Sequence, residues 1–399
     1  MPWQPVDADS YNIAIPLYYQ VQTMLMDRLF KVLEPGDMLP TEKRLCEIYR
    51  VSRSTMRQAL DFLVKEGYIE RFKGRGTFLK KKPHPSYGID DRGSIPTINL
   101  TVPAAHPSGV VSQSIAILDS RALSEGYLLT FTNLDNDIGT LKKHLRTVLS
   151  KEAISGAIYY PVIEPGAAED KNAEIIEIYR EMGVPFVIID RLPLREDELR
   201  DAQPDSVLSL FTTLEYDFVV SDNLHGGYLA TRHMLEMGHR GIAYVAAYLS
   251  HPSFLREEGC RKALRELGTD SIQVVRDSGL LSSEARRREV LRDIRDSGVT
   301  GIFASFDILA RELLHTALAM GIRVPEEISI AGYDDLDFCE YLEVPLTSVR
   351  QPVEDQLKMA LEILFQKIRQ KSPILRHVIL PVELKPRRST APRSRASRR

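Results

Sequence analysis

The chain has 399 residues, 43% of them hydrophobic, so it is long enough for two or three domains and can bury a full core. It has no apolar run of membrane-spanning length, and its N-terminal segment lacks the regions of a signal peptide. These features disfavour membrane and secreted proteins and predict a cytoplasmic one. The three cysteines, Cys46, Cys260 and Cys339, lie far apart, which predicts reduced thiols rather than disulfides or a metal site.

The net charge of -3 hides a strong asymmetry along the chain. Residues 1–82 carry 14 basic and 10 acidic side chains, and residues 41–82 alone have a net charge of +7. Residues 83–386 have a net charge of -13, and residues 387–399 add six arginines and no acid. A basic head beside an acidic body predicts contact with a polyanion at the basic end.

The head, residues 1–79, has apolar residues at helical spacing. A first helix is predicted over 16–33 and a second near 42–49, where Thr41 can serve as the N-cap. A three-residue turn then leads to a third helix over about 53–66, for which we predict a buried face of Met56, Ala59, Leu60, Leu63 and Val64.

The exposed face of the third helix is basic near its start. Two short helices joined by a tight turn, with Arg53 and Arg57 on the second, are typical of a helix-turn-helix that reads the major groove. Residues 68–81 then predict a hairpin, or wing, whose glycine tip approaches DNA. A solvated surface would explain Arg53 alone, but helix, turn, helix and wing in this order favour DNA binding.

Two segments of the head, PLYYQVQ and GDMLPTEKRLCEIYRVSRSTMRQALDFLVKEGYIERFKGRGTFL, closely resemble the winged helix-turn-helix of the GntR family. In that family the start of the second helix, the VSR-x-T-x-R stretch and the wing contact DNA. The resemblance therefore implies DNA contacts from Thr41, Lys43, Arg44, Ser52, Arg53, Ser54, Thr55, Arg57, Lys73, Gly74, Arg75 and Gly76.

Residues 80–96 mix charge, Pro and Gly and predict a linker. Beyond it, in a domain predicted over 97–388, amphipathic helical windows alternate with apolar runs at 98–103, 127–131, 156–160, 186–190, 218–222, 242–246, 301–305, 328–332 and 377–384. Such runs predict parallel strands covered on both faces by helices. The domain is too long for one sheet, so we expect an α/β fold of two doubly wound lobes, as in periplasmic binding proteins. A ligand would bind where the carboxyl ends of the strands face each other.

Two segments depart from this pattern. Residues 192–216 have no clear strand, and Leu208, Leu210 and Phe211 indicate that part of the segment packs against another surface or a second subunit. The tail, 389–399, is rich in Arg, Ser and Ala and predicts disorder, with specific DNA contact as the alternative.

No catalytic motif is found in the body, which predicts a protein that is not an enzyme and uses no cofactor or metal. Acidic residues instead follow several predicted strands, where carboxylates can accept hydrogen bonds from the hydroxyls of a neutral polar ligand. They are Asp190, Asp222, Asp307 and Asp334. Helix capping is the alternative, and for Asp222 and Asp307 both roles stay open.

Several blocks of the body resemble the effector domain of the LacI/GalR repressor family. They include VVSDNLHGGYLATRHMLEMGHRGIAYV, FLREEGCRKAL, GIFASFDILARELLHTALAMGIRVPEEISIAGYDD and PLTSVRQP. A GntR-type head on such a body is the architecture of the arabinose repressor subgroup, which the chain resembles as a whole. The resemblance implies an effector site made of His106, Tyr160, Asp190, Arg191, Tyr228, Arg256, Phe306, Asp307 and Asp334.

The chain departs from the family at some of these positions. Asp334 keeps the family's sugar-binding aspartate, but Phe306 stands where asparagine is usual and Tyr228 where some sugar repressors have arginine. These aromatic residues predict an effector that is less hydrophilic than a typical hexose, or different in size.

We therefore expect a homodimeric transcriptional regulator that binds a palindromic operator with half-sites about 10 base pairs apart. It is expected to repress carbohydrate-utilisation genes and to be released by a small sugar-like effector. The alternative is a corepressor-type regulator that senses a small molecule other than a sugar.

Overall fold

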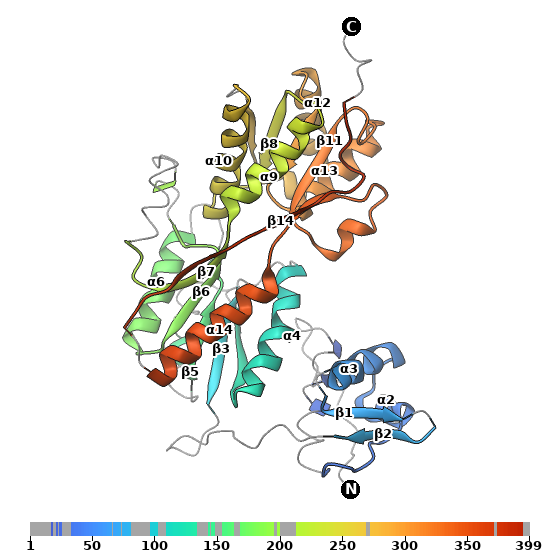
Figure 1. Ribbon diagram of the computed structural model, residues 1–399, viewed down its shortest axis with the longest axis vertical. Coiled ribbons are helices and arrows are strands. Elements are labelled where there is room, and N and C mark those ends of the chain that lie inside the picture. Colours follow the sequence, from blue (N-terminus) through green and yellow to red (C-terminus); the bar gives the residue numbers. More distant parts are fainter. Residues whose placement is uncertain are drawn as a thin grey trace. The chain divides into compact units, whose positions relative to one another are not determined.

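The structure of the chain is a computed structural model (Figure 1). It describes residues 33–80 except 66 and 73, 96–133 except 103–108, 154–194 except 163–167, and 213–393 except 269–271 and 371–372. A few positions outside these ranges, among them 17–18, 21–22 and 24–25, are also described. The chain forms two compact units, of which one contains the head and the other most of the body.

The head contains the predicted helix-turn-helix and wing. Its described elements are α2 (Glu42–Tyr49), α3 (Arg53–Lys65), β1 (Ile69–Phe72) and β2 (Gly76–Leu79). The two strands pair antiparallel, and Gly74 and Gly76 in and after the turn have positive φ angles of 77° and 119°, which glycine adopts without strain. Leu45, Ile48, Met56, Leu60 and Leu63 form the centre of a separate small core.

Val64 is not part of the buried face, because 36% of it is exposed, whereas Met56, Ala59, Leu60 and Leu63 are buried as predicted. The first helix is described only at isolated helical residues within 17–25, and the predicted linker lies mostly outside the described residues.

The first lobe of the body is a six-stranded sheet. Its order is β13-β7-β6-β5-β3-β4. The strands are β3 (Thr97–Val102), β4 (Leu128–Asn133), β5 (Ile154–Tyr159), β6 (Phe186–Asp190), β7 (Asp217–Ser221) and β13 (His377–Leu380). Its described helices are α4 (Gly109–Ser124), α6 (Ala168–Glu181) and α14 (Val353–Gln370), the last of which contacts β5, β6 and β7 (Figure 1).

The second lobe is another six-stranded sheet, with the order β14-β12-β11-β10-β8-β9. Its strands are β8 (Ile242–Ala246), β9 (Ile272–Arg276), β10 (Gly301–Ala304), β11 (Ser329–Asp334), β12 (Thr347–Arg350) and β14 (Glu383–Lys385). Its helical elements are α9 (Asn223–Glu236), α10 (His251–Glu266), α11 (Gly279–Ser282), α12 (Glu284–Asp296), α13 (Asp307–Ala319) and the 3-10 helix η2 (Asp337–Glu340).

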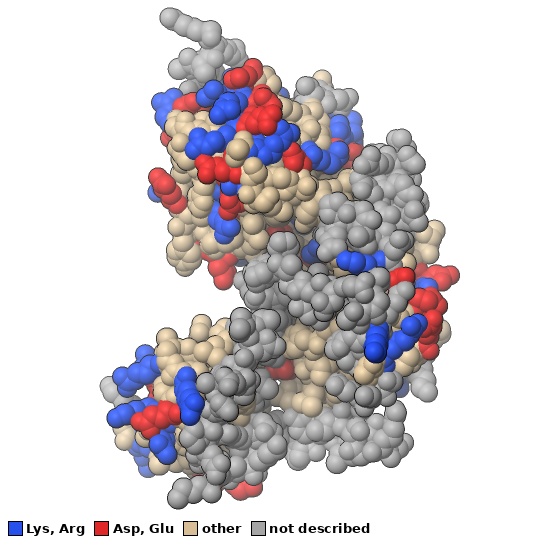
Figure 2. Space-filling view, turned by 180° about the vertical axis from the view of Figure 1, so that it is seen from behind, with Lys and Arg blue, Asp and Glu red and all other residues tan. Residues whose placement is uncertain are grey.

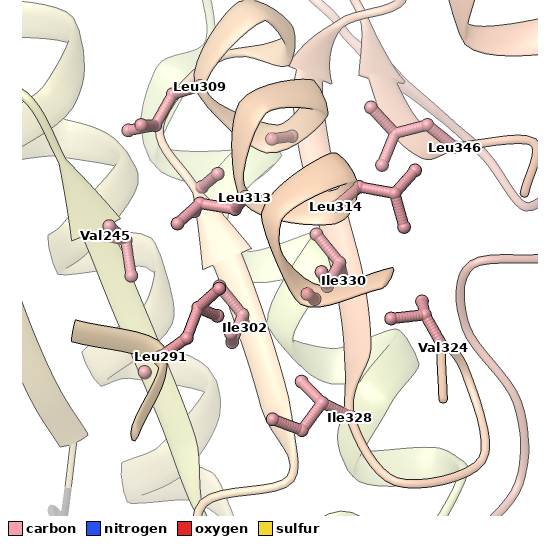
Figure 3. Close-up of a cluster of buried hydrophobic side chains, with 14 of the residues drawn as sticks. Val245, Leu291, Ile302, Leu309, Leu313, Leu314, Val324, Ile328, Ile330 and Leu346 are labelled. Carbon is pink, nitrogen blue, oxygen red and sulfur yellow. The ribbon is translucent and has the colours of Figure 1, made fainter. Parts of the chain in front are cut away.

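Alternation of side chains along the strands divides the core of the second lobe into two layers. On β8, Ala243 and Val245 join the cluster beneath α12 and α13, whereas Tyr244 and Ala246 join the cluster beneath α9 and α10. Figure 3 shows the first cluster, in which leucines of α13 point onto the strands. Helices therefore cover both faces of the sheet, as predicted for a doubly wound fold, and the α/β class is confirmed.

The described chain passes between the lobes three times. It leaves the first lobe after β7 at residue 222, returns after β12 at 351–352, and crosses again between β13 and β14 at 381–382. Residues 377–384, predicted as one strand, are therefore two strands in different sheets. The crossovers bring side chains of both lobes together beside the carboxyl ends of the strands.

The C-terminal tail is not disordered from residue 389 as we expected. Ser389 is fully buried, its hydroxyl donates to the carbonyl oxygen of Ile330 at 2.6 Å, and it accepts from the backbone N–H of Thr347 at 2.8 Å. Arg387 pairs with the carboxylate of Asp335 at 2.6 Å. Residues 387–393 thus form a strap along β11 and β12, and residues 394–399 lie outside the described part of the chain.

Candidate DNA-binding and effector sites

The start of α3 presents an exposed basic surface. Arg53 and Arg57 lie one turn apart with 79% and 66% of their side chains exposed, and both approach Glu42, at 3.9 and 3.8 Å. Figure 2 shows the head at the lower left with Lys and Arg side chains in blue and a few acidic ones between them. The helix end and its arginines form a surface that can bind phosphate and the edges of guanine.

Hydroxyl side chains fix the ends of the two head helices. Thr41 caps α2 by accepting from the backbone N–H of Arg44 at 3.3 Å. At the start of α3, the Ser52 hydroxyl accepts from the backbone N–H of Thr55 at 3.2 Å and contacts the Ser54 hydroxyl at 2.8 Å. These groups remain near the surface, so they can hold the helix ends and contact DNA phosphates.

The remaining described residues that were predicted to contact DNA lie at the surface. Lys43 is exposed, as are Gly74, Arg75 and Gly76 at the wing tip, while Lys73 lies outside the described residues. Arg44 is 62% exposed and pairs with Glu47 at 2.9 Å. We did not predict Glu42, whose Oε1 lies 3.9 Å from Arg53 and 3.8 Å from Arg57.

The first half of the candidate effector site is an ion pair at the end of β6. Arg191 donates from Nε to Oδ2 of Asp190 at 2.6 Å. Burial lowers the pKa of Arg191, but the charges of Asp190, Tyr248 and Asp334 and the hydrogen bond to Asp190 together outweigh this effect, so the pKa is raised. Asp190 has a φ of 70°, in the left-handed region, which costs energy in a residue other than glycine and is common at functional sites.

The second half is Asp334 at the end of β11, whose φ is 111°. Its Oδ1 accepts from Nε2 of Gln351 at 2.8 Å and lies 3.8 Å from Arg256. Arg256 is held by three further contacts: Nε donates to Asn223 Oδ1 at 2.8 Å, a terminal nitrogen donates to the Ser305 carbonyl oxygen at 2.5 Å, and the guanidinium lies over the ring of Tyr333. These contacts within the protein fix the orientation of Arg256.

The charges of the two halves act on each other. Burial raises the pKa of Asp334, and the positive charge of Arg256 opposes this rise. Asp190 and Arg191, from the other lobe, also shift this pKa, in opposite directions. Carboxylates that end strands of both lobes thus lie close enough to interact, and together they can accept hydrogen bonds from a polyol.

Two aromatic rings lie beside these charges. Tyr248 follows β8 and Phe306 follows β10, and their rings stack with centroids 6.2 Å apart and an interplanar angle of 27°. Both side chains are partly exposed. An aromatic face beside carboxylates suits a ligand that has apolar C–H bonds on one side and hydroxyls on the other.

The predicted residue Asp307 is hydrogen-bonded inside the second lobe. It is fully buried, and its carboxylate accepts from the backbone N–H of Leu336 at 2.9 Å and from the hydroxyl of Ser348 at 2.6 Å. The Cys339 thiol contacts it at 3.2 Å. Asp307 therefore holds the loop after β11 instead of binding an effector. Asp222 is a helix cap that accepts from the backbone N–H of His225 at 2.9 Å.

Tyr228 is not brought to the charged cluster either. Its hydroxyl donates to Glu266 at the far end of α10, at 2.7 Å, and its ring stacks on His225. Tyr160 is buried just after β5, at the end of a first-lobe strand, and His106 lies outside the described residues.

Sequence reasoning missed Tyr248 and Gln351. Tyr248 lies two residues after β8, and Gln351 directly follows β12. The rule that the ends of parallel strands line the site would have found both if it had been applied to every strand, β12 included. Within the described residues there is no cluster of His, Cys, Asp and Glu that could hold a metal ion.

A DNA-binding head and a two-lobed body with a polar site between its lobes define a ligand-responsive transcriptional regulator. Residues 17–79 match the family of bacterial regulatory proteins called gntR, and residues 231–390 match the periplasmic binding protein-like domain. Among curated proteins, the chain is 30% identical over 334 residues to an arabinose metabolism transcriptional repressor of Halalkalibacterium halodurans. That match covers 81% of this chain and 82% of the relative. The chain therefore belongs to the family of GntR-headed regulators that includes this repressor.

Two further matches support this family assignment. An arabinose metabolism transcriptional repressor of Geobacillus stearothermophilus is 26% identical over 90% of this chain and 93% of its own. A LacI family transcriptional regulator from Enterococcus faecium, solved with bound ribose, matches the fold with a TM-score of 0.59 at 25% identity. It covers 75% of this chain and 100% of its own. In the described part of this chain, no helix has the length and apolar character needed to cross a membrane.

Proposed function

We propose that the protein represses carbohydrate-utilisation genes and leaves its operator when a neutral sugar binds between the lobes of the body. The observation that carries this proposal is that Asp190 and Asp334, the last residues of β6 and β11 in different lobes, both have a positive φ and carry charges that act on each other. The nature of the relatives supports it, since two of them are repressors of arabinose metabolism and one was solved with ribose.

Binding at a site shared by two lobes provides the mechanism. A sugar whose hydroxyls reach both carboxylates favours the closed arrangement of the lobes, so its binding energy shifts the equilibrium between arrangements. The head binds DNA through Arg53, Arg57 and the wing, and we propose that two copies act together as a homodimer on a palindromic operator. The protein is proposed to act in the cytoplasm and to release its sugar unchanged.

The test combines operator binding with sugar binding. We expect the full chain to form a specific complex with DNA upstream of its own gene, and this complex to dissociate when the correct pentose or hexose is added. Failure to form the complex with or without sugar would overturn the proposal. Tighter DNA binding on addition of a small molecule would instead favour the corepressor alternative.

Two matched variants separate the sites. Asp334→Asn is expected to weaken sugar binding at least about tenfold, because a charged acceptor contributes roughly 1.5–3 kcal/mol, while operator binding without sugar is retained. Asp277→Asn is the control, since Asp277 pairs with Arg286 elsewhere on the second lobe. Recovery of the sugar chemically unchanged after binding would support a sensor and exclude an enzyme.

A further inference from the structure

The start of α13 departs from the usual pattern of helix N-termini. Asp222 caps α9 and Ser250 caps α10 through side-chain hydrogen bonds, but the N-cap of α13 is Phe306, which makes none. Its backbone is extended, with φ -158° and ψ 161°, as an Asn, Ser or Asp cap would also have it. The chain gives up a stabilising cap here, which indicates that the ring has another role.

That role is indicated by what surrounds the ring. Phe306 stacks on Tyr248, and because β10 and β8 are paired in parallel, both rings lie at the same edge of the sheet as Asp334. Burial raises the pKa of Tyr248, and the charges of Arg191 and Asp334 shift it further in opposite directions. The ring pair therefore lies beside both halves of the effector site.

We propose that Phe306 and Tyr248 determine which sugar the site accepts. This inference rests on the proposed sugar-sensing function and names the class of sugar. The faces of the rings can cover C–H bonds, but they cannot replace the hydrogen bonds that a hydroxyl makes with water. The pair selects a sugar that has hydrogen or a methyl group where a hexose has its hydroxymethyl group.

Two series of sugars test this inference. L-arabinose, D-fucose and D-galactose share the configuration of their ring hydroxyls and have hydrogen, methyl and hydroxymethyl, respectively, at the ring carbon that varies. D-xylose, 6-deoxy-D-glucose and D-glucose form the same series with the other configuration at one hydroxyl. Titration calorimetry with the full chain is expected to show that the first two sugars of one series bind at least about tenfold more tightly than the third.

Substitution of Phe306 tests whether its ring causes this preference among sugars. Phe306→Asn provides a side chain that can hydrogen-bond a hydroxyl, so the preference for the deoxy sugar over the matching hexose should fall at least about tenfold. Phe306→Leu stays apolar and should keep the preference while binding every sugar more weakly. An unchanged or higher melting temperature of Phe306→Asn, which can now cap α13, would show that the variant is folded.

Phe338→Asn is the matched control. Phe338 is also a partly buried ring packed on the same core cluster, but it lies beneath Arg311 at 5.0 Å instead of beside Tyr248. Its substitution should leave the order of sugar affinities unchanged. Control and test variants thus differ in the ring that is removed.

The outcomes separate the two proposals. If wild-type protein binds one series but prefers the hexose, or if Phe306→Asn keeps the wild-type order, the inference about the ring pair is overturned and sugar sensing stands. If D-ribose is the one sugar that binds, the inference about the ring pair is likewise overturned and sugar sensing stands. If the wild type binds none of the seven sugars, sugar sensing is overturned and the inference falls with it.

Discussion

Gln351 joins the effector carboxylate to the hinge: its Nε2 donates to Oδ1 of Asp334 at 2.8 Å, and its Oε1 accepts from the hydroxyl of Ser221 at 2.8 Å. Ser221 ends the last first-lobe strand before a crossover, and Gln351 lies in the next crossover. We therefore expect a change at Asp334 on sugar binding to be passed through Gln351 to these two crossover segments.

Replacing the Gln351 amide should uncouple sugar binding from operator binding. We expect Gln351→Leu to bind the operator as well as wild type does when no sugar is present. The change in operator affinity caused by saturating sugar should be at least about fivefold smaller than in wild type, since couplings of this kind are typically 5–150-fold. Gel-shift titrations with and without sugar measure this change. Gln273→Leu, which removes a surface amide bonded to Ser297, should behave as wild type. An undiminished response in Gln351→Leu would contradict the prediction.

The second prediction concerns the recognition helix. Arg57→Ala is expected to weaken specific operator binding by about 1–3 kcal/mol and to reduce the salt dependence of binding, because one cationic contact is lost. Sugar affinity should not change. Arg323→Ala is the control, since Arg323 is similarly exposed, at 70%, and pairs with Glu327 on the second lobe. Equal losses of DNA binding in both variants would argue against a role for Arg57 in recognition.

The third prediction concerns the dependence of stability on pH. Burial first, and then the charge of Asp334, raises the pKa of Asp307 from its ordinary value of 3.8 to about 8. The folded protein thus holds a proton that the unfolded chain loses near pH 4. Its contribution to stability is complete below that pH and is lost as the pH rises towards 8.

Asp307→Asn should therefore gain stability relative to wild type as the pH rises from 5 to 8, by up to about 1.4 kcal/mol per pH unit. Urea unfolding at several pH values measures the difference. Asp277→Asn should show no such gain, because the hydrogen bond from Arg286 lowers the pKa of Asp277. Parallel pH profiles of wild type and Asp307→Asn would disprove the assignment.

The fourth prediction concerns the strap. Asp335 has 1% of its side chain exposed and is neutralised by Arg387 and Arg350, each at 2.6 Å. Arg387→Ala is expected to destabilise the second lobe by about 3 kcal/mol, because removing one partner leaves a buried charge poorly compensated. Arg388→Ala, at an exposed neighbouring position, should have little effect. Similar unfolding free energies for the two variants would show that the strap does not stabilise the lobe.

The sequence predicted strands best where both faces are buried. β6 and β8 have the bounds expected from their apolar runs. By contrast, β12 was missed because Thr347 and Ser348 are polar, yet both are fully buried. Their partners, the tail and Asp307, are distant in sequence, so a local pattern cannot reveal them.

Prediction of the effector site was also limited by contacts between residues that are distant in sequence. Position after a strand identified Asp190 and Asp334, because the ends of parallel strands meet at one edge. It could not show which way a side chain turns, so Asp307 was predicted as a ligand although its partners lie inside the lobe. Phe306 was recognised as an unusual residue, but its partner Tyr248 became evident only from the packing of neighbouring strands.

The three crossovers have a consequence for how such regulators arise by recombination. Neither lobe is a continuous stretch of chain, so exchanging one lobe between genes would need several breakpoints, each of which would have to preserve the register of a strand. The elements of the head, in contrast, all precede the first strand of the body, so a single breakpoint separates the two. One recombination event at this breakpoint is therefore enough to give an existing sensor a new operator.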